Sequence, residues 1–248
     1  KPTHLNGKIE FKDVWFAYLN EDWVIKGVSF TIEPGQNIAF VGATGSGKTT
    51  IAALLCRFYE IQKGEIYIDG INIMEYELNH LRQLIGTVMQ DVFLFPGSIY
   101  DNVILNNQKI TEIEVLKAAS ATGMQVFIDK LPNGLNYQVM ERGSLLSTGQ
   151  RQLISFLRAY LYNPSIMILD EATSSIDSES EQLIQIASEK LTANRTSIII
   201  AHRLSTIKSA DKILVLDKGK LIESGNHDEL MQEKGIYFEL NQSHTSTL

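Results

Sequence analysis

The stretch Gly42-Ala43-Thr44-Gly45-Ser46-Gly47-Lys48-Thr49 decides the fold, because it fits the pattern G-x-x-x-x-G-K-[ST] of a phosphate-binding loop. The apolar run Asn37–Val41 before it predicts a short buried strand, and Thr49–Phe58 after it predicts a helix. A strand, this loop and a helix in succession are the context that the motif requires. The alternative, a glycine-rich turn without a ligand, is disfavoured by that context. We therefore expect a nucleoside triphosphate as ligand.

Each residue type in this stretch suits phosphate binding. Glycines let backbone N–H groups wrap the phosphates, and the helix N-terminus adds the positive end of its dipole. Lys48 supplies a mobile charge, and the hydroxyl of Thr49 can hold Mg²⁺. The predicted nucleotide-binding residues of this segment are Gly42, Thr44, Gly45, Ser46, Gly47, Lys48, Thr49 and Thr50.

Composition indicates an ordinary globular chain. The 248 residues are 44% hydrophobic and 21% charged, enough for a substantial core. The formal net charge of -7 argues against a general nucleic-acid binder, because nonspecific affinity comes from clustered Lys and Arg. Cys56 is the only cysteine, so no internal disulfide forms, which fits a reducing, cytosolic setting. No apolar stretch approaches the ~20 residues that a membrane span needs.

The chain as far as Leu161 contains two different patterns. Alternating apolar residues at Ile9–Phe16 and Val28–Ile32, together with Glu65–Ile68, predict an antiparallel sheet. Helical periodicity dominates from Thr111 to Ala121 and from Thr148 to Leu161. The middle of the chain is therefore expected to be mostly helical.

The second half alternates strands with a helix. Short apolar strands are expected at Ile166–Leu169, Ser197–Ile200 and Lys212–Leu216, with a helix at Ser178–Leu191 whose start, Ser178-x-x-Glu181, has the spacing of a capping box. Strand, helix and strand in this order imply a parallel sheet with covered faces. We expect an α/β fold with a P-loop NTPase core, an antiparallel β subdomain and a helical subdomain.

Two acidic residues follow the apolar run Ile166–Leu169. Carboxylates at the C-terminal end of a buried strand lie where an open α/β sheet binds ligands. Asp170 can hold Mg²⁺, and Glu171 can orient and polarise the attacking water. Acids at a strand end are also common by chance, but the phosphate-binding loop upstream favours the catalytic interpretation.

The segment Leu146-Ser147-Thr148-Gly149-Gln150 opens a helix, and Ser147 with Gln150 has capping-box spacing. The same segment resembles the signature motif of ATP-binding cassette (ABC) proteins, and the resemblance extends over about Gly7 to Leu240. It implies that Ser147, Gly149 and Gln150 bind the ATP of a second such domain. Thr148 departs from the family, where a second glycine is frequent, but Gly149 is retained. We therefore expect the signature motif to bind ATP despite this departure.

Further positions match the family pattern. Tyr18 resembles the aromatic residue that stacks on adenine, and Gln90 resembles the glutamine that links the γ-phosphate site to the helical region. Ser174-Ser175-Ile176-Asp177 is similar to the loop that crosses between paired domains, and His202 resembles the switch histidine. Alternatively, Tyr18 is a packing residue, Gln90 and His202 are surface residues, and Asp177 is a turn acid before a helix. The resemblance implies catalytic roles for Glu171, His202, Gln90 and Lys48, and Mg²⁺ binding by Thr49, Gln90 and Asp170.

The segments Glu141-Arg142-Gly143 and Asp91–Phe95 are similar to those of exporter-type cassettes, which usually follow a membrane domain in one polypeptide. A solvated surface turn is the alternative for the charged triplet. The expected organisation is a connector at 1–8, an ABC ATPase domain at 9–240 with a helical subdomain at about 92–160, and a flexible tail at 241–248. The absence of an initiator methionine favours an excised domain.

The resemblance implies that MgATP is bound and hydrolysed at a head-to-tail dimer interface at the cytoplasmic face of a membrane. The expected partners are a transmembrane domain and a second nucleotide-binding domain, identical or homologous, with no nucleic acid. One alternative is a soluble cassette ATPase acting on nucleic acid or ribosomes, but the sequence has no coiled-coil insertion, basic arm or second cassette. Another is an ATP sensor without turnover, which Glu171 disfavours. Lipid, peptide and drug remain equal candidates for the transported substrate.

Overall fold

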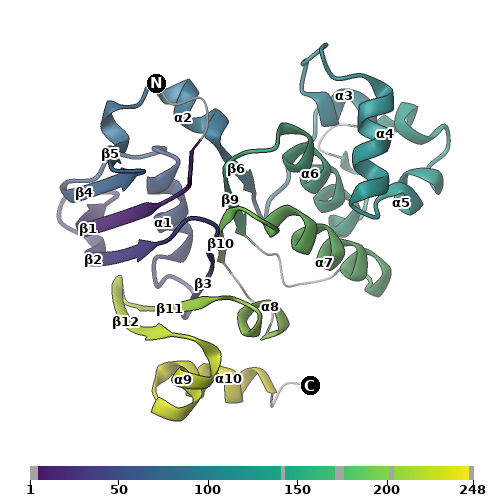
Figure 1. The fold of residues 1–248 in the computed structure, drawn as a ribbon. Helices are drawn as coiled ribbons and strands as arrows, with labels where there is room; N and C mark the ends of the chain where they lie inside the picture. Colours follow the sequence, from purple (N-terminus) through teal and green to yellow (C-terminus); the bar gives the residue numbers. More distant parts are fainter. Residues whose placement is uncertain (1–4, 141–142, 171–175, 201–203, 246–248) are drawn as a thin grey trace. The chain divides into compact units, whose positions relative to one another are not determined.

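The computed structural model describes residues 5–140, 143–170, 176–200 and 204–245, and it divides into two compact units (Figure 1). The first unit comprises Lys1–Gly86, Ser165–Glu171 and Asn194–Leu248, and the second comprises Thr87–Pro164 and Ala172–Ala193. The first carries both large sheets, and the second is mainly helical. This confirms the predicted α/β class with its antiparallel, parallel and helical parts.

The first sheet of the first unit is antiparallel, as predicted. It contains β1 (Ile9–Ala17), β2 (Trp23–Ile32), β4 (Lys63–Ile68) and β5 (Ile71–Asn72) in the order β2-β1-β4-β5. In β1, Ile9 and Phe11 are buried while Lys12 is exposed, so one face of the strand joins the core. Stacked rings of Phe11 and Phe30, 4.5 Å between centroids, tie β1 to β2 within that core.

The second sheet has the order β12-β11-β3-β10-β9-β6. Its strands are β3 (Asn37–Val41), β6 (Ile85–Val88), β9 (Ile166–Asp170), β10 (Thr196–Ile200), β11 (Lys212–Asp217) and β12 (Lys220–Gly225). Strands β11, β3, β10 and β9 are parallel, and β12 adds an antiparallel edge. Ile200 pairs with both Phe40 and Asp170. The C-terminal ends of β3, β10 and β9 therefore finish at one level, where open α/β sheets bind ligands.

Helices in the first unit pack around these sheets. They are α1 (Lys48–Leu55), the 3-10 turn η1 (Ile73–Glu75), α2 (Leu78–Leu84), α8 (Leu204–Lys208), α9 (His227–Glu233) and α10 (Ile236–Thr245). Helix α10 continues past Asn241, after which the sequence indicates a flexible tail. At the other end of the chain, the backbone N–H groups of Asn6, Gly7 and Lys8 donate to the carboxylate of Asp69, which anchors the end of the predicted connector.

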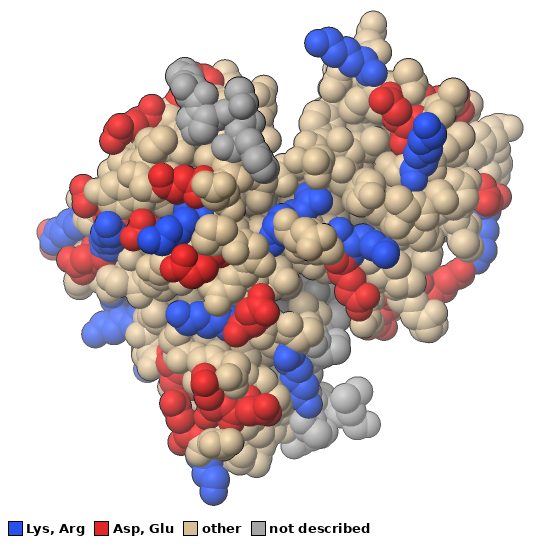
Figure 2. Space-filling view, viewed as in Figure 1, with Lys and Arg blue, Asp and Glu red and all other residues tan. Residues whose placement is uncertain are grey.

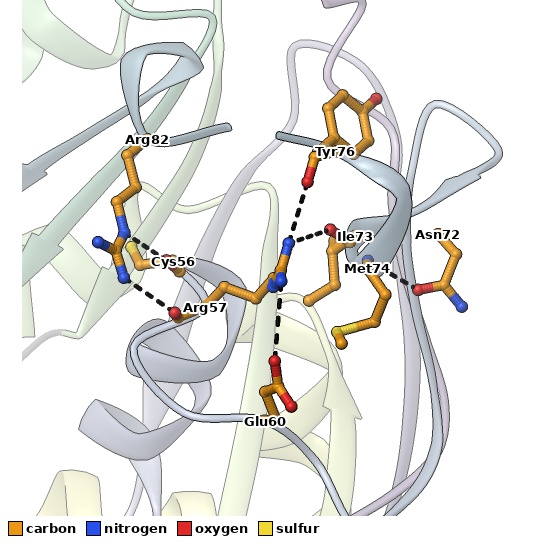
Figure 3. Close-up of polar contacts among 8 residues, drawn as sticks. All are labelled: Cys56, Arg57, Glu60, Asn72, Ile73, Met74, Tyr76 and Arg82. Atoms are coloured by element: carbon orange, nitrogen blue, oxygen red, sulfur yellow. Dashed lines mark hydrogen bonds and ion pairs between the residues drawn. The ribbon is translucent and has the colours of Figure 1, made fainter. Parts of the chain in front are cut away.

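Two arginines fix the C-terminal end of α1 (Figure 3). The guanidinium of Arg82 donates to the carbonyl oxygens of Cys56 at 3.2 Å and Arg57 at 3.0 Å. The guanidinium of Arg57 in turn donates to the carbonyls of Ile73 at 3.2 Å and Tyr76 at 3.0 Å. Carbonyls at a helix end lack partners within the helix, and Arg82 supplies them here, whereas Arg57 ties the chain just after α1 to the turn η1. The helix that begins at the phosphate-binding loop is thus held firmly at its opposite end.

The second unit is built mainly from helices. Its elements are β7 (Gly97–Ser98), α3 (Ile99–Ile104), α4 (Glu112–Ala121), α5 (Gln125–Asp129), η2 (Gly134–Asn136), β8 (Gln138–Val139), α6 (Thr148–Tyr162) and α7 (Ser178–Thr192). The predicted capping box from Ser178 to Glu181 is wrong. The N-cap is Asp177, whose carboxylate accepts from the backbone N–H of Ser180 at 2.9 Å. Aspartate is as good a cap as serine, so the cap lies one residue earlier than predicted, while the helix begins at Ser178 as expected.

Candidate nucleotide-binding site

The loop 42–49 has the backbone conformation that its glycines permit. Gly42, Gly45 and Gly47 have φ angles of 152°, 80° and 109°, in the region that side chains disfavour. A Cβ at Gly42 would lie 2.1 Å from the carbonyl oxygen of Leu216, and one at Gly47 would lie 2.7 Å from Cδ1 of Ile25. Glycine is therefore required at both positions for the loop to close against the rest of the first unit.

The N-terminus of α1 is open to a ligand. Its N-cap is Gly47, and no side chain within the described part of the chain caps it. The hydroxyl of Ser46 is buried, with the residue 3% exposed, and it has no hydrogen-bond partner among the residues described. Unpaired backbone N–H groups and the helix dipole favour an anion at such an end. The loop thus presents donors to a bound phosphate.

Lys48 places a positive charge at this opening. The residue is 6% exposed, and its ammonium donates to the carbonyl oxygens of Gly42 at 2.7 Å and Ala43 at 3.0 Å. Burial lowers the pKa of Lys48, and the nearby carboxylate of Asp170 partly offsets that effect. These two carbonyls of the loop therefore hold the Lys48 ammonium at the place where phosphate oxygens would bind.

Two predicted magnesium ligands meet at this loop. The hydroxyl of Thr49 donates to Oδ2 of Asp170 at 3.3 Å, and Asp170, at the end of β9, is 5% exposed. No cluster of three or more His, Cys, Asp or Glu that could hold a metal occurs among the described residues. Magnesium usually takes one or two carboxylates and completes its shell with water and phosphate oxygens. A hydroxyl beside a single carboxylate fits that requirement.

Tyr18 lies against the same helix. Its hydroxyl is 3.1 Å from Oγ1 of Thr50, one residue beyond Thr49 on α1. The ring makes edge contacts with Phe16 and Tyr59 at centroid distances of 4.8 Å and 5.0 Å. The residue is nevertheless 49% exposed. Tyr18 is therefore oriented by packing and still has ring surface available for a ligand.

The signature segment lies at the start of α6 in the second unit. The hydroxyl of Ser147 accepts from the backbone N–H of Gln150 at 3.2 Å, and the Gln150 side chain accepts from the N–H of Ser147 at 3.0 Å, which confirms the predicted capping box. A Cβ at Gly149 would lie 2.5 Å from Cβ of Ser180 on α7. The missing side chain of Gly149 is therefore needed for close packing of α6 against α7.

The structure says less about the roles of the remaining predicted site residues. Gln90 is exposed and belongs to the second unit. Asp177 caps α7, as its turn-acid interpretation requires, and its hydrogen bonds from Ser180 lower its pKa. Glu171, His202, the pair Ser174-Ser175 and the pair Glu141-Arg142 lie outside the described residues.

The sequence did not predict one group of hydrogen bonds in the second unit, which Arg158 and Asn102 form. The guanidinium of Arg158 donates to the carbonyls of Phe93 and Asn102 and to the side-chain oxygen of Asn102. The Asn102 amide also donates to the carbonyl of Phe95 at 2.8 Å, so the two side chains hold the segment after Gln90. Burial lowers the pKa of Arg158 to about 10. The available sequence signal for these hydrogen bonds was a charged residue, Arg158, in an otherwise apolar turn of helix α6.

A family model described as "ABC transporter" matches residues 25–174 of this chain, a range that includes most of β2, the phosphate-binding loop, the signature, Asp170 and Glu171. The chain belongs to the ABC transporter family. This match confirms the resemblance seen in the signature and the predicted type of domain, an ABC ATPase.

Similar proteins are ABC transporters from several bacteria. A probable multidrug resistance ABC transporter ATP-binding/permease protein, YheH, of Bacillus subtilis is 50% identical over 94% of this chain. A fatty acid ABC transporter ATP-binding/permease protein of Mycobacterium bovis is 45% identical over 97%, and an ATP-dependent lipid A-core flippase of Saccharophagus degradans is 47% identical over 97%. The chain spans 35%, 38% and 41% of the lengths of these three proteins, respectively.

A solved structure of a bacterial Atm1-family ABC exporter with ATP bound is also similar, with a TM-score of 0.88 and 38% identity over 96% of this chain and 42% of that chain. In the described part of the ABC chain, no helix combines the length and the apolar character that crossing a membrane requires. On the face drawn in Figure 2, Lys and Arg side chains are interspersed with Asp and Glu.

Proposed function

We propose that this chain is the motor domain of an ABC exporter, which binds and hydrolyses MgATP to drive a substrate across a membrane. The observation that carries the proposal is the open N-terminus of α1, where the buried Ser46 hydroxyl has no partner among the described residues and Lys48 supplies a buried charge. An anion with several oxygens satisfies all of these groups at once. A triphosphate is the ligand of that chemistry that the family uses.

Each residue is assigned a role that its chemistry supports. On binding, Lys48 would exchange the carbonyls of Gly42 and Ala43 for phosphate oxygens, and Thr49 and Asp170 would hold Mg²⁺ through their oxygen atoms. The chemistry that Mg²⁺ supplies at such a site is neutralisation of phosphate charge. Tyr18 stacks on the adenine. Glu171, which follows Asp170 in sequence, orients and polarises the attacking water.

The proposal includes a second domain. Ser147, Gly149 and Gln150 would contact the ATP held by a second copy or a homologue. Gln90 and His202 would instead sense the γ-phosphate of the ATP held by this chain's own loop 42–49. ATP binding would close this head-to-tail pair and hydrolysis would reopen it, which is a ligand-driven shift between two states. The fused ATP-binding/permease architecture named for the relatives supports a transmembrane partner, with this domain at the cytoplasmic face. Because those names cite drugs, fatty acids and lipid A, they assign no substrate to this chain.

The decisive experiment compares hydrolysis with binding in Glu171→Gln. We expect the variant to bind ATP as the parent does, to hydrolyse it at least ~10²-fold more slowly, and to accumulate as an ATP-bound dimer in gel filtration. Glu181→Gln serves as a matched control, because Glu181 is another acidic residue, on helix α7, with no assigned role in hydrolysis. Hydrolysis at the parent rate by Glu171→Gln would refute the catalytic role of Glu171.

A second measurement addresses the pairing. If the signature is supplied by the partner, the steady-state ATPase rate per chain rises with protein concentration while monomer predominates. A rate per chain that is constant from dilute monomer to concentrated dimer would contradict a shared site.

A further inference from the structure

The strand that leads to Tyr18 loses its backbone partner on one side before it ends, while on the other side Ala17 still pairs with Trp23 of β2. Strand β1 pairs with β4 as far as Trp15 opposite Lys63, and the backbone N–H of Gln62 adds a bond to the carbonyl of Trp15 at 3.1 Å. Strand β4 begins at Lys63, so it offers no backbone groups to Ala17. Ala17 is 3% exposed, and leaving its buried N–H and C=O without partners would be unfavourable.

The side chain of Gln62 takes the place of the missing strand. Its Oε1 accepts from the backbone N–H of Ala17 at 3.0 Å, and its Nε2 donates to the carbonyl oxygen of Ala17 at 2.9 Å. A carboxamide carries one acceptor and donors in the same plane, so it can match both polar groups of one residue as a neighbouring strand does. This bracket holds the residue immediately before Tyr18.

The same connecting segment also supports the ring of Tyr18. Tyr59, which follows α1, meets that ring edge-on at 5.0 Å between centroids and 89° between planes. The hydroxyl of Tyr18 is tied to Thr50 on α1. The segment from Tyr59 to Gln62 therefore orients Tyr18 in two ways, through the ring of Tyr18 and through the backbone that precedes it. Among the described residues, Gln62 forms no hydrogen bond with Tyr18 or with the phosphate-binding loop.

We propose that Gln62 is a positioning residue for adenine recognition. By bracketing Ala17 it fixes the point from which Tyr18 projects, and so it sets the affinity for the base without affecting the affinity for the phosphates. The inference rests on the proposed function, because it takes adenine as the group that Tyr18 contacts. It also explains why an exposed ring at the end of a strand keeps a defined orientation.

The test measures the dissociation constants of ATP, ADP and inorganic tripolyphosphate, each with Mg²⁺, by titration calorimetry of the purified 248-residue chain. Two neutral, partly exposed hydrogen bonds predict that Gln62→Ala weakens ATP and ADP binding alike, by about threefold to tenfold. Tripolyphosphate has no base, so its affinity is expected to stay within about twofold. Gln83→Ala removes another exposed glutamine, on α2, and is expected to change none of the three.

A double-mutant cycle separates positioning from general structural damage. In the Tyr18→Ala background, Gln62→Ala is expected to have no further effect on ATP affinity, because its effect passes through the missing ring. Gln62→Glu is a second variant should Gln62→Ala fail to fold. It keeps the acceptor for Ala17 but places a carboxylate oxygen against the Ala17 carbonyl, and the same selective loss of ATP and ADP affinity is expected.

Three results would overturn the inference: unchanged ATP affinity in Gln62→Ala, equal weakening of ATP and tripolyphosphate, or full additivity with Tyr18→Ala. Failure of the proposed function gives a different pattern. If Tyr18→Ala itself leaves ATP and ADP affinity unchanged, adenine stacking is refuted, and the role of Gln62 is refuted with it. If Tyr18→Ala weakens both nucleotides while Gln62→Ala weakens neither, only the positioning role is refuted.

Discussion

Helices α1 and α6 begin in opposite ways, although both carry residues expected to bind ATP. Helix α1 starts after Gly47, in a left-handed conformation and without a side-chain cap, whereas α6 starts after Ser147, whose hydroxyl is paired reciprocally with Gln150. Both ends have the same dipole and the same number of N–H groups without helical partners. The N-cap residue decides which of these ends is left open to an anion.

Other helices follow the pattern of α6. Capping boxes formed by Ser98 with Asp101, Thr111 with Glu114, and Asn226 with Glu229 begin α3, α4 and α9. Helix α5 also begins without a side-chain cap, but α1 combines an uncapped start with a buried lysine. Because α6, the helix of the signature, is capped by Ser147, it can bind phosphate in only two ways. It can use the exposed Ser147 hydroxyl or the backbone N–H groups that the cap leaves unpaired.

The strongest test of this contrast exchanges glycines for alanine. Gly47→Ala forces a Cβ into a φ of 109° and to 2.7 Å from Ile25, so the loop must change its shape. We expect ATP affinity to fall by at least about 100-fold, since several aligned charge-assisted bonds are lost together. Titration calorimetry measures the loss.

Gly149→Ala is the matched variant for α6. Its Cβ would overpack against Ser180, which costs about 1–3 kcal/mol of stability, measured by denaturant unfolding, with ATP affinity of the monomer unchanged. If Gly149→Ala weakened ATP binding by monomer as strongly as Gly47→Ala, the two helix ends would not differ in function as proposed.

A smaller effect is expected from the charge at the open end. Lys48→Ala removes the buried ammonium, and hydrogen bonds to charged groups contribute about 1.5–3 kcal/mol, so ATP affinity is expected to fall about 10–100-fold. Hydrolysis is expected to suffer more than binding, because negative charge shifts toward the leaving phosphate oxygen in the transition state. Kd and kcat measured on the same preparation would show whether binding or turnover loses more. Equal hydrolysis in parent and variant would remove Lys48 from the site.

At the capped end, Ser147→Ala tests whether the cap has a second role. Loss of the capping hydroxyl costs about 1 kcal/mol of stability, and monomer ATP affinity is expected to be unchanged. Thr111→Ala is the control, because it removes the equivalent box of α4 in the same unit. Both variants are expected to lose similar stability in denaturant unfolding, but only Ser147→Ala should lower the ATPase rate at high protein concentration. Equal ATPase rates in Ser147→Ala and Thr111→Ala would show that Ser147 serves only as a helix cap.

Much of this contrast was predictable from local sequence. The loop 42–49 and the pair Ser147 and Gln150 each depend on residues adjacent in the chain, so their spacing alone predicted the strand, the helix starts and the capping box. The first residue of α7, Ser178, was predicted, but its cap was wrong by one residue because Asp177 and Ser178 are both good caps, and spacing cannot choose between them.

Contacts between distant segments were not predictable in the same way. Nothing in the local pattern around Gln62 indicates that it brackets Ala17, 45 positions earlier. The packing role of Gly149 was missed for the same reason: the glycine was expected for close approach to phosphate, and the structure adds Ser180 as a tight neighbour. Such pairs depend on strand and helix placement, which single-residue patterns do not contain.

The smallest expected effect concerns Thr148, where the family frequently has glycine. A side chain there would hinder phosphate only if it pointed toward the ligand, but its hydroxyl accepts from the guanidinium of Arg151 at 3.1 Å, and that guanidinium also donates to the carbonyl of Leu146 at 2.8 Å. Thr148→Gly is therefore expected to lower stability by less than about 1 kcal/mol and to leave the ATPase rate within about twofold of the parent. Thr148→Ser keeps the hydroxyl and is expected to match the parent in both. A clear rise in ATPase rate on Thr148→Gly would show instead that the threonine obstructs the signature, and the capped helix end would then be open to phosphate at Thr148 as well as at Ser147.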